Sequence, residues 1–141
     1  MRYPLFVTAV LALALTFFAL PANAGPNPAS VTTNITVVGT CSFKVTYSWS
    51  GFSGSGLEAE VVLGSHEEGG LDFVYAWTFT PDQPGSSGSV SAIFTLTGTP
   101  STHEWFGFGQ LFKSERRTVR NSYAESDYLV DTCGSNVTVS P

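Results

Sequence analysis

Residues 41–50 alternate strictly between apolar and polar side chains, and this pattern constrains the fold more than any other feature of the chain. A period of two places every second side chain on one face of an extended segment, so it predicts a half-buried β-strand. The same alternation recurs over residues 31–37, 57–63, 71–79 and 90–96. The sequence therefore predicts five strands, and residues 25–141 show no window with the period of an amphipathic helix.

Turn residues separate the predicted strands. Gly39 and Thr40 are typical of a two-residue hairpin loop in which glycine supplies the positive φ of a type II′ turn. Stretches rich in Gly, Pro and Ser predict longer loops at residues 51–56, 66–70, 81–88 and 98–102.

The pattern is ambiguous after His103, because two sets of alternate residues compete for the inner face. One set begins at Trp105 and the other at Phe106, and a bulge at Gly107 or Gly109 is the expected solution. Weaker strands are expected at residues 118–123, 128–131 and 136–140.

Seven to nine short strands in a chain of this size predict an all-β fold, a two-sheet antiparallel β-sandwich. Over residues 31–139 the chain resembles immunoglobulin-like and fibronectin-III-like domains, and this resemblance rests on the rhythm of the strands. The chain departs from true immunoglobulin domains because Trp49 shares a strand with Cys41, and because Asp131 stands two residues before Cys133 where those domains have a tyrosine. We expect an Ig-like sandwich with its own disulfide, formed by one domain over residues 31–141.

Residues 1–24 have the parts of a secretory signal, with Arg2, an apolar run over residues 5–20 and the sequence Ala22-Asn23-Ala24. The run is shorter than the roughly 20 residues that a membrane-spanning helix needs, and the small residues at its end match the site that signal peptidase cleaves. We therefore expect export, to the extracellular space or to a bacterial periplasm, without stable membrane insertion. Residues 25–30 are expected to be a flexible N-terminal lead.

Cys41 and Cys133 are the two cysteines of the chain, and both follow the predicted signal. An even number of cysteines in an exported domain predicts a disulfide. Closing a loop of this length stabilises a fold by about 4 to 5 kcal/mol in the loop-entropy model, before strain is subtracted. The alternative is a reactive thiol pair or part of a metal site, but metal sites usually need four ligands at closer spacing. We expect neither a metal nor a cofactor.

The charge balance argues against nucleic acid as a partner. The chain has 6 Lys and Arg residues against 11 Asp and Glu residues, and Arg2 belongs to the predicted signal. An acidic surface repels a phosphate backbone. Charged residues make up only 12% of the chain, and the abundant Ser and Thr suit the solvent faces of β-sheets.

Residues that often carry catalysis occur without a recognisable motif. His66 and His103 have acidic neighbours, but residues 66–70 lack the second histidine of the helical zinc-protease pattern. Ser53-Gly54-Ser55-Gly56 resembles a nucleophile elbow, yet it lies in a predicted loop and no helix follows it. Paired carboxylates of the kind that glycosidases use could come from Glu58, Glu60 or Asp72. Glu58 and Glu60, however, fall on the outer face of a predicted strand, where they favour solubility. We therefore expect a protein that is not an enzyme.

Most of the basic residues lie close together, and the cluster consists of Lys113, Arg116, Arg117 and Arg120. On an otherwise acidic chain this asymmetry is the best candidate for a binding site. Because Arg binds carboxylates and similar anions with a planar fork, the expected ligands are an anionic polysaccharide, a carboxylate or an acidic protein surface. The alternative is that the cluster protects an edge strand and pairs with nearby acids, namely Glu115, Glu125 and Asp127.

Most aromatic residues fall on inward positions of the predicted strands, where they fill the core. The exceptions are Phe52, in a Gly-Ser loop, and whichever of Trp105, Phe106 and Phe108 a bulge leaves outside. Exposed rings of this kind stack on sugars. We therefore take Phe52 and Trp105 as candidate binding residues, together with the basic cluster.

Two segments match the acceptor pattern for N-glycosylation, Asn34-Ile35-Thr36 and Asn136-Val137-Thr138. In a chain so rich in Ser and Thr, one match is expected nearly by chance. Asn34 and Asn136 are therefore candidate glycosylation sites only if the exporting cell is eukaryotic.

These observations favour a secreted, non-catalytic β-sandwich module that recognises a protein or a glycan through its surface. The first alternative is a small extracellular hydrolase or enzyme inhibitor, with its site in the loops at residues 51–56 or 81–88. The second is a structural subunit of a cell-surface assembly, in which an edge strand pairs with a neighbour. Fold analogy cannot choose between them, because one fold hosts many functions.

Overall fold

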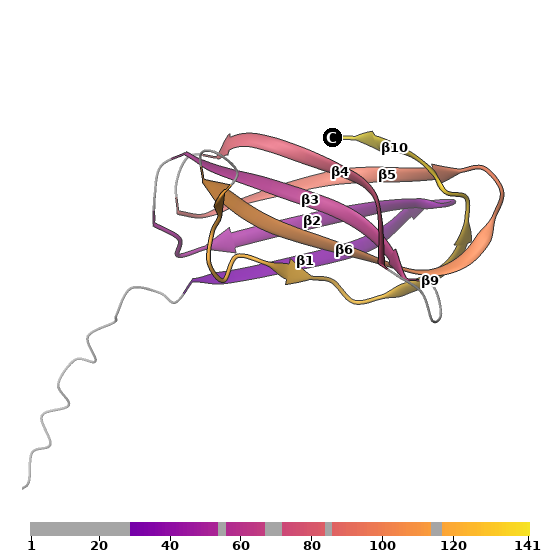
Figure 1. Cartoon of the computed structure of the whole chain (residues 1–141), viewed down its shortest axis with the longest axis horizontal. Helices are drawn as coiled ribbons and strands as arrows, with labels where there is room; N and C mark the ends of the chain where they lie inside the picture. Colours follow the sequence, from indigo (N-terminus) through magenta and orange to yellow (C-terminus); the bar gives the residue numbers. More distant parts are fainter. Residues whose placement is uncertain (1–28, 54–55, 67–71, 84–85, 114–116) are drawn as a thin grey trace, which may run out of the picture.

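The five alternating segments all form strands (Figure 1). They are β1 (Ser30–Gly39), β2 (Ser42–Ser50), β3 (Leu57–His66), β4 (Asp72–Gln83) and β5 (Gly88–Thr97). The computed structural model describes residues 29–53, 56–66, 72–83, 86–113 and 117–141, and for residues 72–83 it defines the backbone. The predicted signal and most of the N-terminal lead lie outside these ranges. Within them all regular structure is β-strand, and no helix is long and apolar enough to cross a membrane.

The second half of the chain adds one long strand and four short ones, β6 (Ser101–Lys113), β7 (Arg117–Thr118), β8 (Ala124–Glu125), β9 (Leu129–Cys133) and β10 (Asn136–Ser140). The strands expected near residues 128–131 and 136–140 are confirmed as β9 and β10. The strand expected over residues 118–123 is wrong. It ends after Thr118, because Asn121 adopts a left-handed backbone with φ 59°, a conformation that Asn tolerates better than most residues and that a strand cannot contain.

The strands form two antiparallel sheets. One has the order β1-β2-β5-β10, and the other has the order β4-β3-β6-β7, with β8 and β9 also paired to β6. Side chains from alternate positions of both sheets meet in one core, as the period of two requires. Its fully buried large residues include Phe43, Tyr47, Phe94 and Trp105. The predicted all-β, two-sheet arrangement is confirmed.

Strand β6 contains no bulge, contrary to expectation. Its pairing with β3 is continuous from Glu104 to Phe112, and the Trp105 set of side chains faces the core. Gly107 and Gly109 belong to that set, and their missing side chains leave room for Val45 and the ring of Tyr47 on β2. A Cβ atom at Gly109 would lie 2.2 Å from ring atoms of Tyr47. These glycines therefore allow the two sheets to approach, and they do not bend the strand.

Two predicted turns differ from the observed ones. The β1–β2 loop consists of Thr40 and Cys41, since Gly39 pairs with Ser42, and the positive φ belongs to Cys41 (49°). The loop expected at residues 81–88 begins later, because β4 continues through Pro81 to Gln83. Proline is tolerated there because β4 is an edge strand and the pairing with β3 shifts between Leu57 and Ala59.

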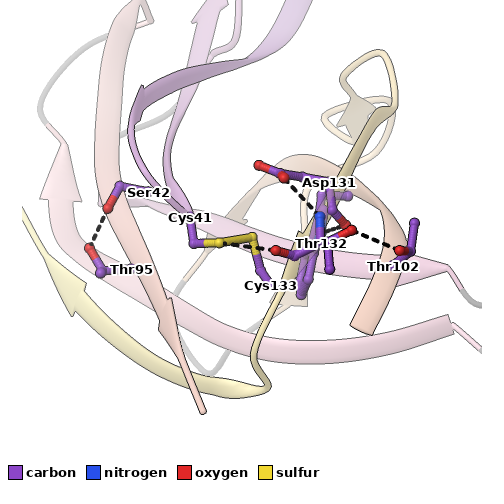
Figure 2. The surroundings of a disulfide bond; sticks show 8 residues. Cys41, Ser42, Thr95, Thr102, Asp131, Thr132 and Cys133 are labelled. Atoms are coloured by element: carbon purple, nitrogen blue, oxygen red, sulfur yellow. Dashed lines mark hydrogen bonds between the residues drawn. A yellow bond between two sulfur atoms is a disulfide. The ribbon is translucent and has the colours of Figure 1, made fainter. Parts of the chain in front are cut away.

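Cys41 and Cys133 form the predicted disulfide, with Cα atoms 5.6 Å apart and a sequence separation of 92 residues. Figure 2 shows that the bridge ties the β1–β2 loop to the end of β9, one sheet to the other. The Cys41 Sγ lies 3.4 Å from the carbonyl oxygen of Thr132, whose hydroxyl is hydrogen-bonded to that of Thr102 at 2.7 Å. Asp131 also lies near the sulfurs. Both sulfurs are engaged in the bridge, so this group offers no thiolate to a metal.

Candidate functional site: a cationic hollow at one end of the sandwich

The basic cluster lines a surface hollow of 460 Å³ at the end of the sandwich opposite to the disulfide. Its cations are Lys113, Arg117 and Arg120, and all three are exposed. The other lining residues are Ala29, Gly51, Phe52, Ser53, Thr118, Val119 and Asn121. The hollow thus joins the start of β1, the β2–β3 loop and the segment around β7. Arg116, the fourth predicted member of the cluster, lies outside the described residues, as does Glu115.

The hairpin between β6 and β7 places two cations side by side. Lys113 at the end of β6 pairs directly with Arg117 on β7, and like charges at such a cross-strand position destabilise a sheet. Lys113 and Arg120 have no ion-pair partner anywhere in the described ranges. The alternative interpretation, in which neighbouring acids neutralise the cluster, therefore receives no support from these two residues. This concentration of positive charge is suited to holding an anion.

Arg120 is positioned by a turn that the core anchors. Ser122 is fully buried, and its hydroxyl donates to the carbonyl of Val119 at 2.6 Å and accepts from the amide of Leu111 at 3.2 Å. Below it, the hydroxyl of Tyr47 donates to the carbonyl of Ser122 at 2.5 Å. Burial raises the pKa of Tyr47, which keeps this donor protonated. One rim of the hollow is therefore preorganised by bonds to β2 and β6.

Phe52 lines the hollow but is not the exposed ring that the sequence suggested. Only 6% of its surface is exposed, and the residue belongs to the core cluster. Its amide donates to the carbonyl of Ser86 at 3.2 Å, which ties the β2–β3 loop to the segment before β5. The expectation of an exposed Phe52 is therefore wrong. Its ring closes the end of the core and forms an apolar wall beside the cations.

Trp105 is also not the exposed ring that the sequence suggested. It is fully buried, its ring stacks on Phe43 at a centroid distance of 5.8 Å, and its indole nitrogen donates to the carbonyl of Asp131 at 3.3 Å. Because β6 has no bulge, Phe106 and Phe108 take the outer face. Trp105 is thus a core residue, about 8 positions along β6 from Lys113 and roughly 25 Å away at the usual rise of a strand.

His103 lies at the disulfide end and not near the hollow. It is buried on the inner face, where its Nε2 is hydrogen-bonded to the hydroxyl of Ser101 and its Nδ1 lies 3.5 Å from the hydroxyl of Ser65. His66, at the end of β3, pairs in register with Asp72 and Glu104. Residues 67–71, including Glu67 and Glu68, lie outside the part of the chain that the structure describes. Because Ser65 faces the core, the next residue, His66, occupies an outer position of β3, on the opposite face of the sheet from His103.

The remaining candidates lie on strand surfaces. Glu58 and Glu60 occupy outer positions of β3, as predicted, opposite Phe112 and Gln110. Asn34 on β1 and Asn136 on β10 are both exposed. No sequence motif marks the other polar residues of the hollow, although Asn121 followed by Ser122 is a recognisable turn signal.

Comparison with protein-family models, with characterised proteins and with solved structures yields no match.

Proposed function

We propose that this protein is a secreted, non-catalytic recognition module of the β-sandwich type that binds an anionic group at the cationic hollow. The observation that carries the proposal is the convergence of Lys113, Arg117 and Arg120 around one cavity with an apolar wall. A volume of 460 Å³ is within the range of small-ligand sites. Export is supported by the signal-like residues 1–24 and by the disulfide, which forms in oxidising compartments.

The strand order supports an immunoglobulin-like or fibronectin-III-like assignment. In immunoglobulin-type sandwiches the first, second and fifth strands share one sheet, and the third and sixth share the other. Here β1, β2 and β5 share one sheet and β3 and β6 share the other, while β4 joins β3. The disulfide differs from the immunoglobulin one, since it starts in the β1–β2 loop. In such sandwiches loops at the ends often form the binding surface, which fits the place of the hollow.

The expected ligand carries carboxylate or sulfate groups, on a polysaccharide or on an acidic protein segment. Guanidinium groups bind such planar or tetrahedral anions through paired donors, and lysine adds a mobile charge. Because the cations are exposed, each contact contributes modestly and falls with rising salt. We therefore expect weak binding to one anionic group and useful affinity only for a ligand that repeats it.

Charge reversal within the hollow tests the proposal. Lys113→Glu and Arg120→Glu are compared with Lys44→Glu, which makes the same charge change at an exposed site on β2, away from the hollow. Binding of dextran sulfate and alginate is measured by calorimetry, with uncharged dextran as the control ligand. We expect each hollow variant to lower affinity about tenfold, equivalent to about 1.4 kcal/mol, and Lys44→Glu to change it less than about twofold. Equal losses in all three variants would show that net charge, and not the hollow, governs binding.

A second candidate function, ester hydrolysis, is favoured by the hydrogen bonds of His103. The exposed Ser101 is hydrogen-bonded to Nε2 of His103, and the buried Ser65 lies beside Nδ1. Ser101 could thus act as the nucleophile, His103 as its base and Ser65 as the group that orients the ring. In this reaction the Ser101 oxygen attacks the ester carbonyl while His103 accepts its proton, the alcohol leaves with that proton, and water then hydrolyses the acyl-serine. A panel of phenyl esters tests it, with Ser101→Ala as the inactivating variant and Thr99→Ala as the matched control. Absence of turnover by the native protein rules it out.

A further inference from the structure

We propose that a row of four aromatic rings on the outer face of the six-stranded sheet binds a neutral polysaccharide chain. The row consists of Tyr128, Phe106, Phe108 and Tyr123, and we call it the aromatic row. It is separate from the hollow and does not depend on the function proposed for the hollow. The sequence did not single out the two tyrosines.

The rings form one continuous series along β6. Centroid distances are 5.3 Å from Tyr128 to Phe106, 6.1 Å from Phe106 to Phe108 and 5.6 Å from Phe108 to Tyr123. Phe106 is only 4% exposed, whereas Tyr128 and Tyr123 are 51% and 48% exposed. The phenylalanines thus form the support, and the tyrosines present the ring surface that a ligand can reach.

Buried serines hold the tyrosines in place before any ligand arrives. Ser126 donates its amide to the carbonyl of Gly107 at 2.8 Å, and its hydroxyl accepts from the amide of Gly107 at 2.8 Å. Ser122 makes the corresponding hydroxyl contact to Leu111. These bonds replace strand pairing where the edge segment is interrupted between β7, β8 and β9. Each tyrosine follows an anchored serine by one or two residues, so little conformational entropy is lost when a ligand binds.

The charges around the row select the kind of ligand. On the outer face of β3, β6 and β8, as far as the side chains are described, the charged residues are Glu58, Glu60, Glu104 and Glu125, with no Lys or Arg. The hydroxyl of Tyr123 donates to the carboxylate of Glu125. Carboxylates repel sulfated or uronic polymers, phosphate-rich membranes and nucleic acid, but they accept hydrogen bonds from neutral sugar hydroxyls.

A sugar chain fits this surface better than a folded protein does. Aromatic faces stack on the C–H faces of pyranose rings, and neighbouring rings with centroids 5.3 to 6.1 Å apart offer an extended surface to a polymer. The apolar core of a protein interface is depleted in charge, and moving several carboxylates out of water into such a core would be costly. Sugar hydroxyls can donate to the carboxylates while water still reaches them. The two exposed tyrosines and the adjacent carboxylates therefore point to a glycan.

The experiment measures retention of the full mature protein on neutral polysaccharides, both soluble (mixed-linkage β-glucan, xyloglucan, galactomannan) and particulate (cellulose, chitin). The variants are Tyr123→Ala and Tyr128→Ala, with Tyr128→Phe to keep the ring and Val37→Ala as a control, since Val37 is 58% exposed at the far end of β1. Thermal unfolding establishes that each variant is folded. We expect binding to at least one of these polymers, weakened about tenfold or more by either alanine variant and little changed by Tyr128→Phe or Val37→Ala.

The outcomes separate this site from the hollow. Binding that persists in Lys113→Glu and in high salt but disappears in Tyr123→Ala supports the aromatic row. Failure to bind any of the polymers, or retention that the alanine variants leave unchanged, overturns it. Capture of a basic protein by the same tyrosines, without retention on the polymers, also overturns it and assigns the face to a protein partner.

Discussion

Substitution of Gly109 by alanine tests the packing of the two sheets most directly. The new Cβ would lie 2.2 Å from Cγ and Cδ2 of Tyr47, whereas carbon atoms in contact are normally about 3.5 to 4.0 Å apart. The ring of Tyr47 has little room to retreat, because it is fully buried, stacks on Trp49 at 5.7 Å and is hydrogen-bonded to Ser122. A displacement of more than an ångström is therefore needed.

The expected loss of stability is about 3 kcal/mol. Overpacking of a core usually costs about 1 to 3 kcal/mol, and the size of this displacement places the cost at the upper end of that range. The shift also weakens the Tyr47 hydrogen bond, which is worth about 0.5 to 1.5 kcal/mol. The lower entropy of the unfolded alanine chain returns about 0.4 to 1 kcal/mol. For a domain of this size such a loss lowers the melting temperature by about 12 °C.

Gly39→Ala is the matched control. A Cβ there would lie 3.5 Å from the Ser42 Cβ, an ordinary contact, and Gly39 has no positive φ. Urea unfolding of both variants, with the disulfide intact, should show a loss for Gly109→Ala and a change within about 0.5 kcal/mol for Gly39→Ala. In a Tyr47→Ala background the penalty of Gly109→Ala should disappear, because the clashing ring is gone. If both glycine variants are equally stable, or if the penalty persists without the ring, the explanation of the close sheet approach is refuted.

Three further predictions concern the stability of the sandwich. Reduction of the disulfide, or Cys41→Ser with Cys133→Ser, should lower the free energy of unfolding by about 2 to 5 kcal/mol in urea melts, and an unchanged midpoint would contradict a stabilising bridge. Tyr47→Phe should cost about 1 to 3 kcal/mol, because the Ser122 carbonyl loses its buried donor. Burial raises the pKa of Tyr47 above its unfolded value of 10.0. The contribution of the protonated Tyr47 to the free energy of unfolding is therefore complete below about pH 10 and is lost as the pH rises further. In alkaline urea melts the Tyr47→Phe variant should consequently lose stability less steeply than the native protein. Ser122→Ala should lower the free energy of unfolding by about 1 to 3 kcal/mol, because it leaves the Leu111 amide unpaired. The control Ser48→Ala removes an exposed hydroxyl that is hydrogen-bonded to Ser89, and it should change that free energy by less than about 0.5 kcal/mol in the same assay.

The parts of the fold that depend on local pattern were predictable. Alternation located β1 to β5, and the inner positions of β2, from Phe43 to Trp49, are all buried. The cysteine pairing followed from there being only two. Turn details were less predictable, because the left-handed residue of the β1–β2 loop is Cys41 and not Gly39, and because Pro81 is permitted by the edge position of β4. Neither the register nor the edge position is visible in a local pattern.

The candidate site was predictable in part. Clustering along the chain was enough to single out Lys113, Arg117 and Arg120, because their separation in sequence is small. The burial of Phe52 and Trp105 was missed, because a ring in a Gly-Ser loop can still close the core, and because two opposite parities in β6 have similar apolar content. Tyr123 and Tyr128 were missed for a different reason. Their position depends on hydrogen bonds that the amides of Leu111 and Gly107 on β6 donate to the hydroxyls of Ser122 and Ser126. Such pairings between neighbouring strands do not show in an alternation pattern.

The sequence by itself determined the extended conformation, the alternation of inner and outer faces, the one available cysteine pair and the segregation of positive charge, because each depends on residue type and short-range spacing. Only the tertiary structure decided which face of β6 turns inward, because Val45 and Tyr47 on β2 need the space that Gly107 and Gly109 leave on that face. It also brought the β2–β3 loop to the basic segment and so formed the hollow. These outcomes arise from contacts between segments many residues apart, which no local pattern encodes.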